Sequence, residues 1–521
     1  MLLIQNWEGL RRTLHQALSF VNDRRDGLEL QSAMLRVPLH VKVTPDWRRM
    51  VARAAYRSGD LKACLELLKG SEGAPLLTPF RAWVTLEEAG YEEALKLSEA
   101  ALEGTDAESE DADVALRVRC FALAQLGRPE WASAYEQSLR LLTGRQRGLA
   151  LLEFGAFRTL SGDDAAARSC YAQALGVLRD DRYFAAQLNY NMAVACLRLE
   201  LLDDALRYAT ASRDAALHED GARFAARSWS GLGAVQRARE EWPRALHSYE
   251  KAVLQATDAD DRMQAWRGQA QTLRVTGKAD AALVTLYEAN EFKPDHDALR
   301  VDIAAAKLQL GDLRGAQATL ETAQKARHAE DQARATLLRA ELARCAGDEP
   351  LAFNLLNGLE LTRTWAREER WCFPALFALL NEKPQPPLPM RVCVVMDGAV
   401  RVSINDCLLN GGLGNREASL LARLVTASVP LTTERLLEDL QVSGRDSRRR
   451  SQSLSRVKQQ LCEALGWKTA VGVTRGVYAL DETVSWALEL PVLTQSDAFC
   501  DGLYDPWVLE WRQARLEPNG T

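Results

Sequence analysis

Apolar residues recur at helical spacing through most of the first 380 residues, in segments that each break at a short polar turn. An apolar helix ends in a turn, often Gly-Asp, and a second helix then opens with a spaced alanine and an aromatic residue or leucine. ARAAYRSGDLKACLELL, residues 52–68, and AAAKLQLGDLRGAQATLETA, residues 304–323, are two of nine such segments. Apolar positions three and four residues apart are typical of amphipathic helices, so the pattern predicts antiparallel helix pairs.

The turns recur with a nearly constant period, which averages 36 residues over the nine segments. Glycine suits the left-handed backbone that such a turn requires. A small residue four or five positions later would let the two helices of a pair approach closely. The turn positions are Gly59, Gly90, Gly127, Gly162, Glu200, Glu240, Gly277, Gly311 and Gly347, and the small residues are Ala63, Ala94, Ala166, Ala205, Ala245, Ala281 and Ala316.

These segments resemble the tetratricopeptide repeat, whose period is about 34 residues. The resemblance covers roughly residues 45–360 and predicts an array over 46–380, preceded by a helical cap over 1–45. Such repeats bury their faces only against their neighbours, so they stack into a curved superhelix. The resemblance implies a protein or peptide partner in the solenoid groove. A spacer or a dimerisation scaffold is the alternative, and the sequence does not identify the ligand.

The pattern changes at residues 381–389, NEKPQPPLP. Four prolines exclude a helix and favour extended geometry, so we expect a short semi-rigid linker. The next segment, MRVCVVMDGAVRVSINDCLL, residues 390–409, is rich in β-formers and contains two turn signals. The array is therefore expected to end at residue 380, and a small mixed domain to follow the linker.

Three amphipathic helices and a hairpin follow these strands. The helices are expected at 415–427, 432–440 and 447–467, and the hairpin lies in TAVGVTRGVYAL, residues 469–480. Strands, three helices and a terminal hairpin predict a winged helix-turn-helix over 390–481. The fold class is therefore mostly α, a tetratricopeptide-like helical solenoid followed by a small α+β winged helix-turn-helix domain.

The predicted winged helix resembles the output domain of OmpR-type response regulators and, more closely, the DNA-binding domain of the Streptomyces antibiotic regulatory protein family. RVCVVMDGAVRVSINDCLL, NREASLLARLV, SLSRVKQQLCEALGW and VTRGVYAL carry the resemblance. Residues 482–521 form an acidic tail that resembles the start of a bacterial transcriptional activator domain. In this chain the repeat array stands before the DNA-binding domain, whereas in that family the helical repeats follow it.

Charge is distributed unevenly along the chain, which has a net charge of −6. Residues 390–480 contain thirteen Lys and Arg against eight Asp and Glu, while residues 481–521 contain two against eight. The basic excess includes RDSRRRSQSLSRVKQQL, residues 445–461. On a helical wheel its apolar side consists of Leu454, Val457, Leu461 and Leu465, so its basic side is predicted to face outward.

The outward side combines residue types that hydrogen-bond to base edges and phosphates. Arginines in a first helical turn oppose the helix dipole, so helix stability does not explain them. A merely solvated charged face is the alternative. The predicted DNA-binding residues are Arg448, Arg449, Gln452, Ser455, Arg456 and Gln459 on this helix, Lys468 and Arg475 before and in the wing, and Arg416 at the start of the first helix.

Several chemical classes have no support in the sequence. It contains no phosphate-binding loop, no HExxH, no GxSxG and no CxxC, so we expect no enzyme activity, no metal and no cofactor. The ten cysteines are expected to be buried apolar residues in a reducing compartment. No apolar run approaches the roughly 18 residues that span a membrane, and the N-terminus does not resemble a signal peptide. A cytoplasmic location without membrane contact is the expectation.

Together these features predict a bacterial transcription regulator that binds double-stranded DNA, with activation favoured over repression by the resemblance alone. RNA polymerase is a further candidate partner. A homodimer is an open alternative to a monomer, because one winged helix covers little DNA surface. The competing hypothesis is a non-enzymatic protein–protein scaffold whose winged helix no longer binds DNA. The operator, the regulon and the oligomeric state do not follow from the sequence.

Overall fold

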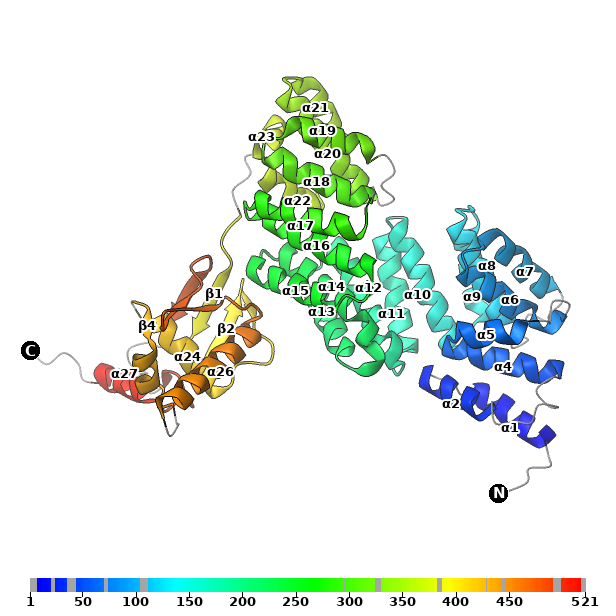
Figure 1. Cartoon of the computed structure of the whole chain (residues 1–521), viewed down its shortest axis with the longest axis horizontal. Coiled ribbons are helices and arrows are strands. Elements are labelled where there is room, and N and C mark those ends of the chain that lie inside the picture. The colour runs from blue at the N-terminus through cyan, green and yellow to red at the C-terminus, as the bar shows by residue number, and fades with distance from the viewer. Residues whose placement is uncertain are drawn as a thin grey trace, which may run out of the picture. The chain divides into compact units, whose positions relative to one another are not determined.

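The computed structural model describes residues 7–19, 24–34, 44–69, 74–103, 111–294, 296–323, 329–381, 387–427, 429–442, 446–490 and 498–516. The chain divides into two compact units, Met1–Ser228 and Trp229–Thr521. Figure 1 labels helices and strands of both units. The middle of the predicted proline-rich linker, residues 382–386, lies outside the described residues.

The first unit consists of helices, and most of them pack against the next helix along the chain. Their bounds are α1 Trp7–Ser19, α2 Arg24–Met34, α4 Pro45–Ser58, α5 Leu61–Leu68, α6 Thr78–Glu87, α7 Tyr91–Glu103, α8 Ala112–Gln125, α9 Trp131–Leu141, α10 Gly144–Leu160, α11 Asp164–Val177, α12 Arg182–Arg198 and α13 Leu202–Ala216, with short 3-10 helices at Pro75–Leu77 and Glu219–Phe224. The helix pairs predicted over this part of the chain are thus present.

The second unit begins within α14, continues with further helices of the same kind and ends in an α+β domain. The helices before that domain are α14 Ala225–Ala238, α15 Trp242–Gln255, α16 Ala259–Val275, α17 Ala279–Phe292, α18 Asp297–Gln309, α19 Leu313–Thr322, α20 Ala329–Cys345, α21 Glu349–Asn357, α22 Thr364–Cys372 and α23 Pro374–Phe377, followed by a 3-10 turn at Ala378–Leu380. The fold is therefore mostly α, with tetratricopeptide-like helical repeats in both units.

The turns between paired helices lie where the glycine pattern predicts them. Eight of the nine predicted turn residues have positive φ, including Glu200 at 59° and Glu240 at 62°. In the second repeat the left-handed residue is Ala89 and not Gly90. At several of these turns the next amide donates to the carbonyl five residues earlier, as from Asp163 N to Arg158 O at 2.9 Å. This bond satisfies a carbonyl at the helix end.

A small buried residue lies five positions after most of these left-handed residues. Three of the small residues predicted to face the partner helix are therefore corrected. Ala63, Ala166 and Ala281 are only half-buried. The position that faces the partner helix is one residue further along in those three repeats, because the spacing is counted from the left-handed residue. Eight residues that stand five positions after a left-handed turn residue have no exposed surface, and they are Cys64, Ala94, Ala167, Ala205, Ala245, Ala282, Ala316 and Ala352.

Two small sheets form the β-part of the α+β domain. One has the order β3-β2-β1-β7 and the other the order β4-β6-β5. The strands are β1 Arg391–Val395, β2 Arg401–Ile404, β3 Cys407–Leu408, β4 Leu431–Thr432, β5 Val471–Thr474, β6 Val477–Leu480 and β7 Ser485–Glu489. All pairings are antiparallel except that of β1 with β7. The sequence pattern missed β4 and β7, because β4 has two residues and β7 is at most half-buried.

The helices of the domain are α24 Asn415–Thr426, α25 Thr433–Asp439, α26 Ser447–Leu465 and α27 Pro506–Leu516. The first three agree with the predicted helices to within two residues at each end. Thr432 caps α25 by accepting a hydrogen bond from the Arg435 amide at 3.3 Å. The tight turn between β5 and β6 contains Arg475 at φ 51° and Gly476 at φ 80°.

The C-terminal segment packs into the same apolar core as these elements. Phe499, Leu503, Trp507 and Val508 are buried together with residues of β1, α24 and α26. The Ser419 hydroxyl on α24 donates to Asp505 at 2.5 Å and accepts from the Trp507 indole at 3.3 Å. The sequence predicts residues 482–521 as a tail separate from the domain. The structure corrects this prediction, because residues 498–516 complete the apolar core of that domain.

The ten cysteines are all free thiols. Seven are buried, as expected, but Cys345 is exposed and Cys372 and Cys407 are half-buried. Within the described part of the chain, no helix is long and apolar enough to cross a membrane.

Candidate functional site

Helix α26 has one buried side and one exposed side, and its two ends are capped. The Asp446 carboxylate accepts a hydrogen bond from the Arg449 amide at 2.8 Å, and Gly466 ends the helix in the left-handed conformation at φ 91°. The residues of the apolar stripe, Leu454, Val457, Leu461 and Leu465, are at most 7% exposed. Burial of this stripe fixes the rotation of the helix about its axis.

The outward side of α26 is exposed along its whole length. Among the described residues, Arg448 and Arg456 have no ion-pair partner, while Arg449 lies 3.9 Å from Asp446. Gln459 donates to Glu463 at 3.0 Å. The exposed residues are Arg448, Arg449, Gln452, Ser455, Arg456 and Gln459, and Arg450 is exposed as well. All six predicted contact residues on this helix therefore lie on one accessible side.

The tip of the β5–β6 hairpin carries Arg475, which is exposed. The hairpin is joined to the start of α25 by two hydrogen bonds of 2.8 Å, from the amide and the hydroxyl of Thr433 to the Gly476 carbonyl. Arg416 is exposed in the first turn of α24. Both cations are accessible, but each stands on a different element from the arginines of α26.

Lys468 differs from the other predicted residues because it is already paired. Its ammonium group lies 3.0 Å from a carboxylate oxygen of Glu250 on α15. A second bond joins the α+β domain to the repeats, because Asn405, in the turn between β2 and β3, donates to the Arg239 carbonyl at 2.7 Å. Lys468 thus belongs to a contact between the α+β domain and a helical repeat.

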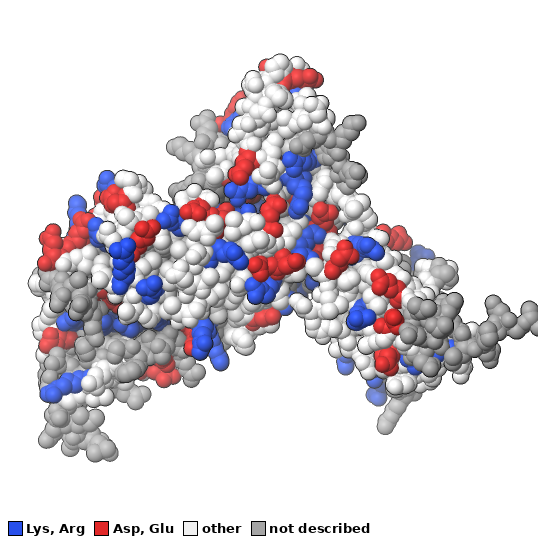
Figure 2. Space-filling view, turned by 180° about the vertical axis from the view of Figure 1, so that it is seen from behind, with Lys and Arg blue, Asp and Glu red and all other residues white. Residues whose placement is uncertain are grey.

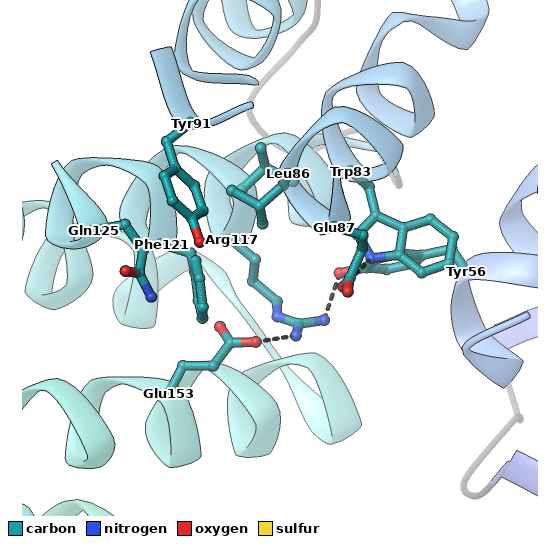
Figure 3. Close-up of a pocket in the computed structure, with 10 residues that line it drawn as sticks. Tyr56, Trp83, Leu86, Glu87, Tyr91, Arg117, Phe121, Gln125 and Glu153 are labelled. Carbon is teal, nitrogen blue, oxygen red and sulfur yellow. Dashed lines mark hydrogen bonds and ion pairs between the residues drawn. The ribbon is translucent and has the colours of Figure 1, made fainter. Parts of the chain in front are cut away.

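A pocket of about 210 Å³ lies in the first unit, and sequence reasoning did not find it (Figure 3). Its residues come from the first helices of four successive repeats and from α7. The signal that points to it is an aromatic or charged residue in the second half of each first helix, where inward positions are otherwise apolar. The pocket is lined by Tyr56, Trp83, Leu86, Glu87, Tyr91, Arg117, Val118, Phe121, Gln125 and Glu153.

Arg117 is the charged centre of this pocket. It forms an ion pair with Glu153 and donates to Gln146 at 2.8 Å and to the Tyr56 hydroxyl. Burial opposes the charge of Arg117, but Glu153 and Tyr56 outweigh it, so its pKa lies above the usual value. Burial has the opposite effect on the Tyr56 phenol and raises its pKa. The guanidinium therefore stays charged and the phenol neutral at physiological pH.

The pocket walls combine aromatic rings with hydrogen-bonding groups. Trp83 donates to Glu87 at the exposed rim at 3.0 Å, and Tyr91 and Phe121 present half-buried rings. By contrast, acidic and basic side chains are interspersed on the described surface that Figure 2 shows. Aromatic walls around a few placed polar groups are typical of sites for small ligands or peptide side chains.

No protein-family model matches the chain, and no curated protein matches it. Among solved structures it is similar to a Rap protein complexed with Competence and Sporulation Factor, at 14% identity over 59% of this chain and 93% of that chain, with a TM-score of 0.47. The apo form of RapI is similar at 15% identity over 59% and 95%, with a TM-score of 0.43. A thermophilic tetratricopeptide-repeat protein of Thermus thermophilus is similar at 19% identity over 38% and 98%, with a TM-score of 0.31.

Proposed function

We propose that this protein is a DNA-binding transcriptional regulator whose helical repeats bind a protein or peptide partner and thereby control the C-terminal domain. The observation that carries the proposal is the exposed Arg, Gln and Ser side of α26, which lies opposite a fully buried apolar stripe. A helix fits the major groove of B-DNA, and Arg and Gln form bidentate hydrogen bonds with guanine and adenine there.

The neighbouring elements support a winged helix-turn-helix. Helix α25 precedes α26, and the β5–β6 hairpin follows it with Arg475 at the tip. In helix-turn-helix proteins the second helix reads base edges, while contacts to phosphates position the protein on the duplex. Arg475 and Arg416 are suited to phosphate contacts. Lys468 is the weakest member of the set, since Glu250 already holds it.

The sign of regulation follows only from the resemblance to an activator family, which favours activation and adds RNA polymerase as a partner. Two copies of the domain would bury more DNA surface than one, so we propose a homodimer on paired half-sites as the form that reaches high affinity.

The proposal is tested by titrating the full-length protein against a pool of duplex genomic fragments at several salt concentrations. The wild type is expected to bind with an affinity that falls steeply as salt rises. The Arg448→Ala/Arg449→Ala/Arg456→Ala variant should bind more weakly and with a shallower salt slope, by about 0.9 for each phosphate that it no longer neutralises.

A matched control removes three exposed arginines from the repeats, Arg140→Ala/Arg179→Ala/Arg207→Ala, and should bind DNA as the wild type does. Absence of binding by the wild type at low salt would reject the regulator and leave the protein–protein scaffold as the function. Equal weakening in both triple variants would show that only overall charge matters.

A further inference from the structure

Helix α22 departs from the pairing of the repeats and connects helices that are far apart in the chain. Its Glu368 forms an ion pair with Arg237 of α14, 131 residues earlier. The next residue, Glu369, binds Arg274 of α16 and Arg334 of α20. One short helix thus holds first helices from three different repeats.

The contacts of the two carboxylates are extensive. Glu369 accepts from Arg274 at 2.8 Å and from Arg334 at 3.1 Å, and Glu368 accepts from Arg237 at 2.8 Å. Both glutamates are at most 2% exposed. Buried charges of this kind are tolerated only when they are paired and hydrogen-bonded.

Arg237, Arg274 and Arg334 are here called the arginine face, and without α22 two of them, Arg237 and Arg274, would have no carboxylate partner among the described residues. Arg334 also has Asp302 at 2.6 Å. The other contacts of Arg274 are with neutral side chains, namely hydrogen bonds to Gln271 and Gln309 and the Phe373 ring at 5.7 Å. Arg237 likewise contacts only the neutral Tyr249 hydroxyl besides Glu368, among the bonds of the described residues. The arginine face is therefore built to receive two adjacent carboxylates.

Most of the fully buried apolar residues of this region lie after α22, although Trp365 and Cys372 of α22 pack half-buried against the same core. Phe373, Leu376 and Phe377 are buried in the core formed with α18 and α20. Within α22 the apolar contacts are fewer, with Ala366 buried and the Trp371 ring meeting Trp242 edge-on at a centroid distance of 5.6 Å. If α22 left the arginine face without a replacement, buried arginines would lose their counter-charges, which is costly. If a segment of another chain supplied two carboxylates instead, the same ion pairs would form again. Replacement of α22 by such a segment is therefore favoured over simple detachment of α22.

We propose that the arginine face is the docking site for an acidic helical segment of the protein partner, and that α22 occupies this site until the partner displaces it. The segment would present two adjacent Glu or Asp residues. The inference rests on the partner-binding half of the proposed function and not on DNA binding. The chain runs from α22 through α23 to β1, so displacement would act on the segment that leads to the α+β domain.

The test uses the full-length protein without DNA and a labelled peptide of residues 361–372, LTRTWAREERWC, with Cys372→Ser to prevent oxidation. The Glu368→Gln/Glu369→Gln protein should bind this peptide at least tenfold more tightly than the wild type does, because its own helix no longer competes. A peptide with both glutamates changed to glutamine should bind neither protein. Arg237→Gln/Arg274→Gln, added to the Gln variant, should abolish binding.

Hydrogen exchange on the wild type provides a second measurement that needs no variant to fold. Saturating peptide should lower the protection of the α22 amides and leave α18 and α19 unchanged. The control variant, Glu360→Gln, removes only the surface pair with Arg363 and should behave as the wild type does. Peptide binding with α22 still protected, or no binding to the Gln variant when it is folded, would overturn the inference. Either result leaves the DNA titration unaffected.

Discussion

Arg274 and Glu369 form an ion pair of 2.8 Å in which neither side chain is more than 1% exposed, although 95 residues separate them in the chain. The pair connects α16 with α22. Arg334 binds the same carboxylate and continues to Asp302, which also binds Arg267. The buried cluster therefore couples several repeats through charge and not through apolar packing alone.

This cluster should make the free energy of unfolding fall at acidic pH. Burial alone would raise the pKa of Glu369, but Arg274 and Arg334 outweigh it and hold the pKa below the ordinary 4.5. The pKa of Asp302 lies below 3.8 because Arg267 and Arg334 likewise outweigh its burial. A carboxyl whose pKa is lower in the folded state contributes stability above its unfolded value and loses it as pH falls. Urea unfolding should show this loss beginning below about pH 5.

The variant that isolates the effect is Glu369→Gln. It should lower stability at pH 7 by about 3 kcal/mol, because two buried arginines lose a counter-charge. Its further loss between pH 5 and pH 3 should be smaller than that of the wild type. Glu360→Gln, at an exposed pair, should change neither quantity. An unchanged pH dependence in Glu369→Gln would contradict the assignment.

Variants that remove a base contact should affect sequence preference, whereas variants that remove a phosphate contact should affect affinity for all sequences. Gln452→Ala is expected to relax the preference at one base pair by about 1–3 kcal/mol, as when a base contact is removed. Arg475→Ala should weaken binding to all sequences alike and reduce the salt slope by about 1. Lys468→Ala should have a smaller effect than Arg475→Ala, because Lys468 is paired with Glu250. Binding-site selection with each variant measures both properties.

Replacing both members of the Arg117–Glu153 ion pair should lower the free energy of unfolding less than replacing Arg117 alone. Arg117→Met leaves Glu153 as an unpaired, largely buried charge, so unfolding free energy should fall by about 3–5 kcal/mol. Arg117→Met/Glu153→Met replaces both charges by apolar groups and should recover most of this loss. Urea titrations of the three proteins provide the comparison. A double variant as unstable as the single one would show that the pocket needs the charges themselves.

Two glycines should respond in opposite directions to alanine. A Cβ at Gly268 would lie 2.1 Å from a ring carbon of Tyr249, so Gly268→Ala is expected to cost about 1–3 kcal/mol through overpacking. Gly176, in the last turn of α11, has open space around it. Gly176→Ala should stabilise the protein by about 0.5–1 kcal/mol, as expected in a helix. Thermal unfolding of both variants tests the close approach of Gly268 to Tyr249.

The C-terminal segment should be needed for the α+β domain to fold. Trp507 is 6% exposed and packs edge-on against Phe499, so Trp507→Ala is expected to destabilise the domain by about 3–5 kcal/mol. Tyr504, at 72% exposed, provides the control, and Tyr504→Ala should have little effect. Hydrogen exchange in β1 and α24 reports on this domain specifically. Unchanged protection in Trp507→Ala would show that the segment is dispensable.

Local features of this chain follow from short stretches of sequence. The repeat period, the helix pairs, the left-handed turns and the caps at Asp446 and Thr432 depend on residues a few positions apart. The same holds for α26, because the spacing of Leu454 and Leu461 alone decides which side faces the core. These are the features that hydrophobic periodicity and backbone preference determine.

The remaining features depend on residues that meet only after folding. Strand β7 pairs with β1 although most of the domain's chain lies between them, and the segment around Trp507 enters a core that the chain began to build at Met390. The pocket at Arg117 and the docking of α22 require side chains from four and three repeats, respectively. Because each charge there is stabilised by a partner far away in sequence, no local pattern reveals it. Only the tertiary structure decides that Arg274 and Arg334 are buried and that Arg117 is largely buried.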